Sequence, residues 1–400
     1  MKRRLLPILM TLVLVCALPI WAAFVTSGDV TNPLVSTAGA TLPDLQAKID
    51  AAEDNATITL DSDTTITETL VITGKTLTID LNGHVLKMTG DGSVLRVSDR
   101  ATLTITDSRP QNPHTGSYAG LPAGGVITGG KADKGGGILL AGGCTLKLTG
   151  GCITDCHATD TGGGGVVLNG DTAILYMSGT ARIENCTAGE TWGANAIFNS
   201  GTMYADGGTV DGTVNNQGTI RLSEGAAAET VFNGTVYNRS AGTIKAGRYN
   251  ETVENRGTIT GGIFYGGVTN DGGKINDGAY ETVTFNSDGG TPVEEAKVLR
   301  GQKVAKPTDD PTKSGYTFTG WEDANGAGAY DFNTPVIAPL TLTAKWEKNP
   351  SSGGYYYYPT TDTKADDAKG SPKTADPGVA LYAALSILSL TGLTCITKKR

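Results

Sequence analysis

Charged residues are scarce in this sequence. They make up 18% of its 400 residues, against about 25% in an average globular protein. The 32 basic residues are outnumbered by 40 acidic ones, and between the two ends of the chain they form no cluster. Because nucleic-acid-binding surfaces concentrate positive charge on one face, the sequence argues against nucleic acid as a partner.

Patterns that bind metals are missing as well. The sequence has three histidines and no Cys-x-x-Cys pair. A structural zinc site needs such ligands at short, regular spacings, so we expect no metal site, and no motif indicates a cofactor. The cysteines between the two ends of the chain are Cys144, Cys152, Cys156 and Cys186, with His157 as the histidine near them.

Glycine, by contrast, is abundant, with 56 residues. Through 56–280, short segments that alternate polar and apolar residues, such as 76–81, recur between turns rich in Gly and Asn. Later units share the signature Asn-x-Gly-Thr, which begins at Asn199, Asn216 and Asn255. Alternation is the period of β-strands, and Gly and Asn tolerate the backbone conformations of sharp corners.

Each of these units holds too few apolar residues to bury a core alone, whereas stacked copies bury a continuous apolar column. The sequence therefore predicts an all-β fold whose main part, 56–280, is a right-handed parallel β-helix. A β-sandwich with irregular hairpins is the alternative. The region resembles the pectate-lyase-like repeat regions of bacterial surface adhesins.

The segment before the repeats, 28–55, contains a predicted helix at 41–52. Thr41 suits the start of a helix and Pro43 its first turn, and Leu42, Leu45 and Ile49 share one face. Since a stack of strands needs its open apolar end covered, we expect this helix to cap the β-helix.

Cys156 and Cys186 each follow an isoleucine, Ile153 or Ile183, by three residues. In adjacent coils their thiols would lie nearly above one another. Two interpretations stay open. One is a buried ladder of thiols that pack as small apolar groups; the other is a disulfide, which the spacing of about 5 Å between adjacent strands allows.

Residues 281–347 carry a different, aromatic pattern. Its most specific parts are Gly-Tyr-Thr-Phe-Thr-Gly-Trp at 315–321 and Ala-Lys-Trp at 344–346. These resemble an internalin-B-type repeat of secreted bacterial proteins, which implies a small β-grasp-like domain. A domain of this size needs large side chains to fill its core; an exposed aromatic platform for sugars is the alternative. The rings expected in the core are those of Tyr316, Phe318, Trp321, Phe332 and Trp346.

The first residues have the layout of a secretory signal peptide. A basic start, Lys2-Arg3-Arg4, precedes an apolar stretch at 5–20 and then small and polar residues. We therefore predict a signal peptide over 1–27. An uncleaved N-terminal anchor is the alternative.

The last thirty residues combine a Pro-x-Thr motif, an apolar run at 379–396 and a basic end. As a helix, the run would be about 27 Å long, close to the ~30 Å core of a bilayer. The basic end would stay in the cytoplasm. Before these features, 348–370 is typical of a flexible spacer; its run Tyr355 to Tyr358 is either unspecific or adhesive.

This order resembles the cell-wall sorting signal of Gram-positive sortase substrates, here over 371–400. The resemblance implies that sortase cleaves after Thr374, within the motif Pro372, Lys373, Thr374 and Ala375, and links the Thr374 carbonyl to peptidoglycan. Ser371 and Ala375 depart from the family's usual Leu-Pro-x-Thr-Gly. A plain tail-anchored membrane protein is the alternative.

A polysaccharide lyase or glycoside hydrolase built on the β-helix is the rival function. A hydrolase needs two carboxylates about 5–9.5 Å apart, and a lyase needs a basic residue beside acidic calcium ligands. Aspartates in Gly- and Asn-rich turns are more often turn formers than catalysts, so we expect no catalytic residues. The candidates to follow are Asp155, Asp160, Asp206 and Asp211.

Together these patterns predict a non-enzymatic protein anchored to the cell wall of a Gram-positive bacterium, outside the cell, with a C-terminus that spans the membrane before sorting. Sortase and peptidoglycan are its expected partners. An adhesive or scaffolding role would add a glycan or protein ligand, whose identity the sequence leaves open.

Overall fold

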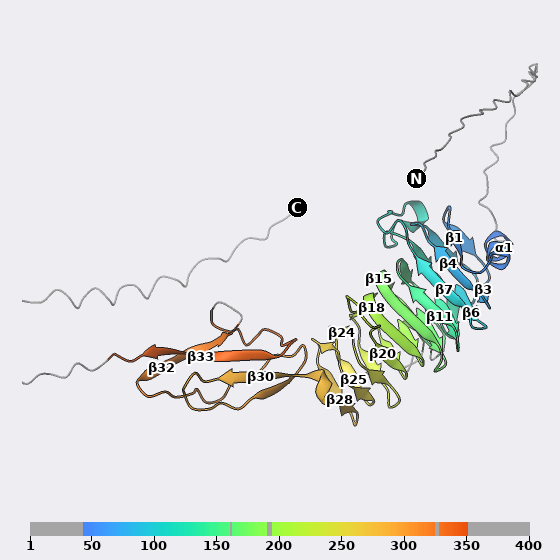
Figure 1. The fold of residues 1–400 in the computed structure, drawn as a ribbon. Helices are drawn as coiled ribbons and strands as arrows, with labels where there is room; N and C mark the ends of the chain where they lie inside the picture. The colour runs from blue at the N-terminus through green and yellow to red at the C-terminus, as the bar shows by residue number, and fades with distance from the viewer. Residues whose placement is uncertain (1–42, 161, 190–193, 325–327, 351–400) are drawn as a thin grey trace, which may run out of the picture. The chain divides into compact units, whose positions relative to one another are not determined.

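The computed structural model describes residues 43–160, 162–189, 194–324 and 328–350 (Figure 1). The predicted signal peptide and sorting signal, with Thr374 and the apolar run 379–396, lie outside the described residues, as does the spacer from residue 351 onward. No helix of the described part is long and apolar enough to cross a membrane. The described residues up to Lys348 belong to one compact unit.

Most of this unit is a stack of parallel strands. In each coil the chain runs through one strand ladder, turns a corner into a second, and returns through a third (Figure 1). For example, β4, β5 and β6 of one coil pair in parallel with β7, β8 and β10 of the next. The fold is thus all-β and β-helix-like, which confirms the broader prediction, and its parallel pairing excludes an antiparallel sandwich.

The first and second ladders form one sheet because the long strands β15 and β18 run through both. Among the described residues this sheet contains β1 (Ala56–Thr59), β2 (Thr64–Ile66), β4 (Thr76–Asp80), β5 (Val85–Met88), β7 (Thr102–Thr106), β8 (Val126–Thr128), β11 (Thr145–Leu148), β12 (Cys152–Thr154), β15 (Ile174–Glu184), β18 (Thr202–Val210), β20 (Thr219–Arg221), β21 (Val231–Phe232), β23 (Thr243–Ile244), β24 (Arg248–Tyr249), β26 (Thr258–Ile259), β27 (Ile263–Phe264) and β29 (Lys274–Ile275).

The third ladder is a separate parallel sheet, and a short sheet lies at one corner. The third ladder consists of β3 (Leu70–Thr73), β6 (Leu95–Ser98), β10 (Ile138–Ala141), β14 (Val166–Asn169), β17 (Ile197–Asn199), β19 (Val214–Asn216), β22 (Val236–Asn238), β25 (Val253–Asn255) and β28 (Val268–Asn270). The corner sheet consists of β9 (Lys131–Ala132), β13 (His157–Ala158) and β16 (Thr187–Ala188), and the 3-10 turns are η1 (Gly116–Tyr118) and η2 (Asp277–Ala279).

A column of asparagines runs inside the later coils. Each amide donates from Nδ2 to Oδ1 of the next, at 2.7 Å from Asn199 to Asn216, 2.8 Å to Asn238, and 2.7 Å for the steps to Asn255 and Asn270. Asn199, Asn216, Asn238 and Asn255 are fully buried. We call this column the asparagine ladder. Three of its members, Asn199, Asn216 and Asn255, begin the Asn-x-Gly-Thr signature.

The glycine of the signature has a steric reason. A Cβ at Gly218 would lie 2.0 Å from the carbonyl oxygen of Gly201 in the preceding coil, and one at Gly257 would lie 2.2 Å from that of Gly242. Real Cβ atoms do not approach this closely, so the corner accepts glycine alone at these positions. The close approach is what lets the asparagine amides of adjacent coils meet.

Helix α1 (Pro43–Ala51) lies against β3 at the first coil (Figure 1), within the range predicted for it. Its Leu45 and Ile49 join the core of the stack. The Gln46 amide accepts from the backbone N of Val71 (2.8 Å) and donates to its carbonyl (3.1 Å). Lys75 in turn donates to the carbonyls of Ile49, Asp50 and Ala52. The helix therefore covers the edge of β3 at Val71.

The small domain is a mixed sheet in the order β31 (Ala296–Leu299), β30 (Tyr280–Asn286), β33 (Leu340–Lys348), β32 (Tyr316–Asp323). Strands β30 and β33 are parallel, and the other pairs are antiparallel. Trp321 is buried at its centre, and Phe318, Phe332 and Trp346 pack against the same cluster, as predicted.

Tyr316 departs from the prediction, because it is 37% exposed and Lys313 lies over its ring at 4.9 Å from the centroid. Its place in the sheet gives the reason, because Tyr316 is the first residue of β32 and pairs with Lys348, the last residue of β33. A bulge follows in the same strand, where the register with β33 shifts between Phe318 and Gly320, and both Phe318 and Trp321 face the core. A bulge of this kind re-aims one side chain relative to its neighbours.

The four central cysteines are buried thiols, not disulfides. The pairing of Ile153 with Ile183 and of His157 with Thr187 sets Cys156 beside Cys186 in adjacent coils. This is the arrangement of the ladder interpretation. A hydrogen bond from Cys156 and burial raise the pKa of the Cys186 thiol.

Candidate functional site

The aspartates singled out from the sequence do not meet in one site. Asp155 and Asp160 are exposed on the turns around β13, and Asp155 adopts a positive φ of 51°, a conformation that Asp tolerates better than most residues. His157 between them bonds through Nδ1 to the Thr187 hydroxyl at 2.8 Å. The group therefore shapes a corner of the stack.

Asp206 and Asp211 lie in later coils and serve as links between coils. The Asp206 carboxylate accepts hydrogen bonds from the backbone N (2.7 Å) and the hydroxyl (2.6 Å) of Ser223. Asp211 accepts from the amide of Asn233, which accepts in turn from Asn250. Asp206 and Asp211 thus each accept hydrogen bonds from a residue of the next coil.

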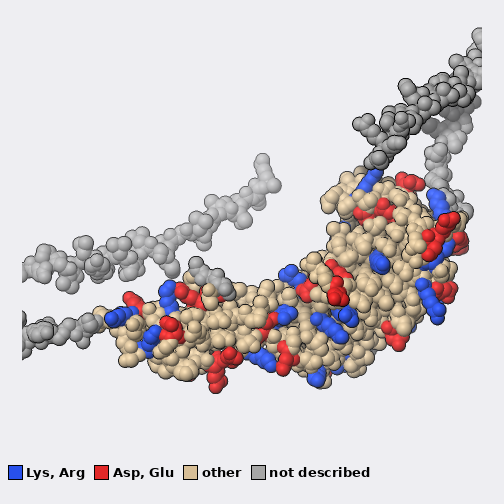
Figure 2. Space-filling model, in the orientation of Figure 1, with Lys and Arg blue, Asp and Glu red and all other residues tan. Residues whose placement is uncertain are grey.

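The described residues contain no cluster of three or more His, Cys, Asp and Glu side chains that could hold a metal ion. On the face drawn in Figure 2, charged side chains are scattered over a largely uncharged surface. Any binding surface on that face must therefore rely on shape and neutral polar groups as well as charge.

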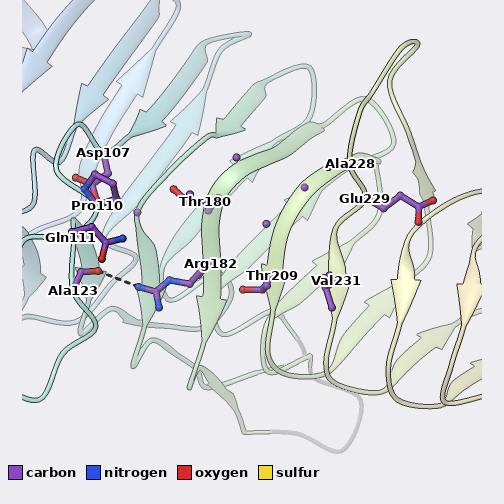
Figure 3. A pocket seen from close by; sticks show the side chains of 15 residues that line it. Asp107, Pro110, Gln111, Ala123, Thr180, Arg182, Thr209, Ala228, Glu229 and Val231 are labelled. Carbon is purple, nitrogen blue, oxygen red and sulfur yellow. Dashed lines mark hydrogen bonds between the residues drawn. The ribbon is translucent and has the colours of Figure 1, made fainter.

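A groove of about 590 Å³ runs along a corner of the described stack, and we call it the corner groove (Figure 3). Small residues line it where β15 and β18 turn from the first ladder to the second, among them Gly179, Ala181 and Gly207. The loop between β7 and β8 forms one wall. Its volume falls in the range of ligand sites, about 300–1,000 Å³.

Some polar side chains of the corner groove already make hydrogen bonds within the protein. Asp107 accepts from the backbone N of Gly83 (2.7 Å) and of Gly125 (2.6 Å), which anchors the wall loop. The Arg182 guanidinium donates to the Ala123 carbonyl at 3.2 Å, as the dashed line in Figure 3 shows. Asp107 and Glu229 lie at opposite ends of the view in Figure 3.

Under the same loop, Cys152 faces outward from the stack and is buried with Val85 and Val126. Tyr118 and Leu121 of the loop pack on this cluster. Burial raises the pKa of the Cys152 thiol, and Glu184 adds to the rise. Since the nucleophile of cysteine chemistry is the thiolate, this thiol is a packing group.

Two stacked tyrosines mark the outer face of the first ladder. The rings of Tyr176 and Tyr204 are parallel within 3°, with centroids 4.4 Å apart. Lys147 lies over the first ring and Arg221 over the second, in the coils before and after. Both faces of the pair are thereby covered, which leaves no face on which a sugar could stack.

One pair of neighbouring basic residues was not predicted from the sequence. Arg239 and Arg256 are far apart in sequence, but each follows an asparagine of the ladder, and Asn238 pairs with Asn255 in β22 and β25. The two arginines thus lie on adjacent coils, and both line two shallow hollows of the third ladder. The sequence contained a signal for this pair, because an arginine directly follows Asn238 and Asn255.

Comparison with known proteins identifies the small domain alone. Residues 282–345 match the Listeria-Bacteroides repeat domain, a repeat found in bacterial surface proteins. The match falls within 281–347, where the sequence predicts an internalin-B-type repeat, and it confirms the broader form of that prediction, a surface-protein repeat.

Two curated relatives come from Evansella cellulosilytica. One, named "Putative Gly-rich membrane protein", is 40% identical over 70 residues, which is 17% of this chain and 8% of the relative. The other, named "Putative membrane protein", is 39% identical over 70 residues, 17% of this chain and 10% of the relative. The chain thus spans a tenth or less of either relative. No solved structure matches the chain significantly.

Proposed function

We propose that this chain is a non-enzymatic surface protein of a Gram-positive bacterium, exported by residues 1–27 and linked to peptidoglycan through Thr374 by sortase. The stack, wound as a right-handed parallel β-helix, is its rigid body and carries a binding face for a glycan or protein ligand. The small domain joins this body to the spacer. Right-handed winding is what the geometry of parallel crossover connections favours.

The proposal of a non-enzymatic protein rests on the hydrogen bonds that three aspartates accept within the stack. Asp206 and Asp211 accept hydrogen bonds from the next coil, and Asp107 anchors a loop. A general acid or nucleophile must instead direct its oxygens at the substrate. The surface location is supported by the match of 282–345 to a repeat of bacterial surface proteins.

A polysaccharide-degrading enzyme is the second candidate, and the corner groove favours it. The groove is large enough for several sugar residues, and it holds Arg182 and Glu229. Full-length protein should show no turnover of uronate polymers or neutral glycans, with or without calcium. Turnover that is lost in Glu229→Gln would establish the enzyme instead.

The location is tested in the native host. Muramidase digestion should release the protein with wall fragments attached to Thr374, detected by mass spectrometry. Thr374→Ala should shift the protein to the membrane fraction and the medium, whereas Thr361→Ala in the spacer should not. Covalent attachment that persists in Thr374→Ala would refute the anchoring mechanism.

A further inference from the structure

Two arginines, each directly following an asparagine of the asparagine ladder, lie next to each other on the third ladder. Because Asn238 pairs with Asn255, the next residues, Arg239 and Arg256, sit one strand spacing apart, or about 4.8 Å between backbones. Burial lowers the pKa of Arg239, and the charge of Arg256 lowers it further. Both guanidinium groups nevertheless stay charged at neutral pH, so they repel each other.

Neighbouring side chains hold this pair in place. Arg256 donates to the Asp271 carboxylate from Nε at 2.8 Å and from Nη2 at 2.7 Å. Arg239 donates from Nε to the Asn215 amide oxygen at 3.3 Å, and its guanidinium lies over the Tyr237 ring, 4.9 Å from the centroid. Both guanidinium groups are thus oriented before any ligand arrives, which lowers the entropic cost of binding.

The pair separates two hollows of different character. On one side, Glu254 and Asp271 line a hollow of about 270 Å³. On the other, a hollow of about 510 Å³ has no acidic residue among the described residues that line it. This second hollow, which we call the arginine hollow, is lined by Arg239, Arg256, Phe198, Asn215, Gln217 and Ser240.

We propose that the arginine hollow binds a sugar residue that carries a carboxylate, as part of an acidic glycan. Guanidinium forks suit carboxylates, and charge-assisted hydrogen bonds are the strong ones. The Gln217 amide and the Ser240 hydroxyl can donate to and accept from ring hydroxyls. The half-buried ring of Phe198 offers an apolar surface for the C–H face of the sugar.

The neighbouring charges restrict the ligand further. Glu254 and Asp271 lie just across the arginine pair, so a densely charged polyanion would meet like charge as soon as it extended past the hollow. A glycan whose carboxylate-bearing residue is flanked by neutral residues avoids this repulsion. This inference rests on the proposed function, because it names the ligand class of the displayed stack.

The test uses host cells that display the full-length chain, with display measured by an antibody to the chain. Fluorescent galacturonate oligosaccharide and sialyllactose conjugates represent the two sources of a sugar carboxylate, and lactose and maltohexaose conjugates are the neutral controls. We expect saturable binding of at least one acidic probe and no binding of its neutral counterpart. The acidic probe that binds identifies the source.

Variants then locate the binding. Arg239→Gln combined with Arg256→Gln should weaken acidic-probe binding at least tenfold at equal display. Arg239→Lys, which keeps the charge and loses the fork, should weaken it less. Arg248→Gln is the charge-matched control, since Arg248 bonds to Tyr265 on another ladder, and it should leave binding unchanged. Resistance of the displayed chain to protease checks the fold of each variant.

Two outcomes overturn the inference. One is the lack of binding to every acidic probe at full display; the other is acidic binding that survives the double arginine change. Neither touches the wall attachment of the same cells, which muramidase release measures separately. The proposed ligand class can therefore be refuted without refuting the proposed surface location, and the reverse also holds.

Discussion

The stack and the small domain bury their side chains by different rules. In the stack, each coil contributes one rung to columns such as the asparagine ladder, and a rung contacts the coils directly before and after it. In the small domain, strands from all parts of the sheet meet in one cluster around Trp321. Stability is therefore spread along the stack and concentrated at one point in the domain.

The length of a coil changes along the stack as well. Thirty residues separate His157 from its neighbour Thr187 one coil later, but 17 separate Asn199 from Asn216 and 15 separate Asn255 from Asn270. Short coils have fewer inward positions. In them, the asparagine ladder and the stacked rings of Phe232, Tyr249 and Phe264, 4.9 and 5.1 Å apart, fill the interior.

The largest expected effect lies in the small domain. Trp321→Ala should cost about 3–5 kcal/mol, which is comparable to the whole stability of a domain this small. Proteolysis of the full chain, followed by mass spectrometry, should then find new cuts within 281–347 while the stack stays protected.

A milder change at the same position serves as its control. The Trp321 indole N–H has no hydrogen-bond partner among the described residues, so its contribution is packing. Trp321→Phe should therefore keep most of the protection. Equal protection in wild type and Trp321→Ala would mean that this cluster does not hold the domain together.

A smaller and local effect is expected in the ladder. Asn238→Ala deprives Asn216 of its acceptor and Asn255 of its donor, and each unsatisfied buried group costs ~1–3 kcal/mol. Hydrogen exchange should speed up in the coils from 214 to 259 and stay slow at β4 and β7.

Asn250→Ala is the matched control for the ladder, because Asn250 makes the same kind of amide bond, to Asn233, on the exposed surface. It should change the free energy of unfolding by less than about 0.5 kcal/mol. If the two asparagine changes had equal effects, burial of the ladder would not explain its stability.

The smallest expected effect is at the first coil. Gln46→Ala removes both side-chain hydrogen bonds to Val71 and should cost about 1–2 kcal/mol. Amide exchange at Val71 measures it directly, with Glu53→Ala as a surface control. Unchanged protection of Val71 would show that the apolar contacts of α1 suffice.

Several features of the fold could be predicted because they repeat in the sequence. The alternation at 76–81 and the Asn-x-Gly-Thr units specify stacked strands, and an apolar face with Pro43 specifies the helix. The burial of the Asn199 amide was harder to predict. A strand pattern does not show that a polar side chain will hydrogen-bond to an identical side chain one coil away.

Other features depend on register, which local patterns do not reveal. Tyr316 was expected inside because 315–321 alternates, but it begins β32 opposite Lys348, at the end of the sheet. That Arg239 and Arg256 are neighbours follows only from the pairing of β22 with β25. Asp155 and Asp160 lie on turns, whereas Asp206 lies within β18 and Asp211 directly follows that strand. The partners of these last two, Ser223 and Asn233, come from the next coil.

The hydrogen bonds of Gln46 to Val71 also bear on how these molecules behave beside one another. The last strand of any parallel stack presents a row of unpaired peptide groups, which can template the strand of another molecule. Here a side-chain amide occupies such a position at β3, and at β27, the last strand of the second ladder, the Phe264 backbone N–H donates to the Arg300 carbonyl at 2.8 Å. Each of these contacts removes one peptide group from the row that another molecule could pair with, which lowers the tendency of a body built from repeated coils to associate end to end.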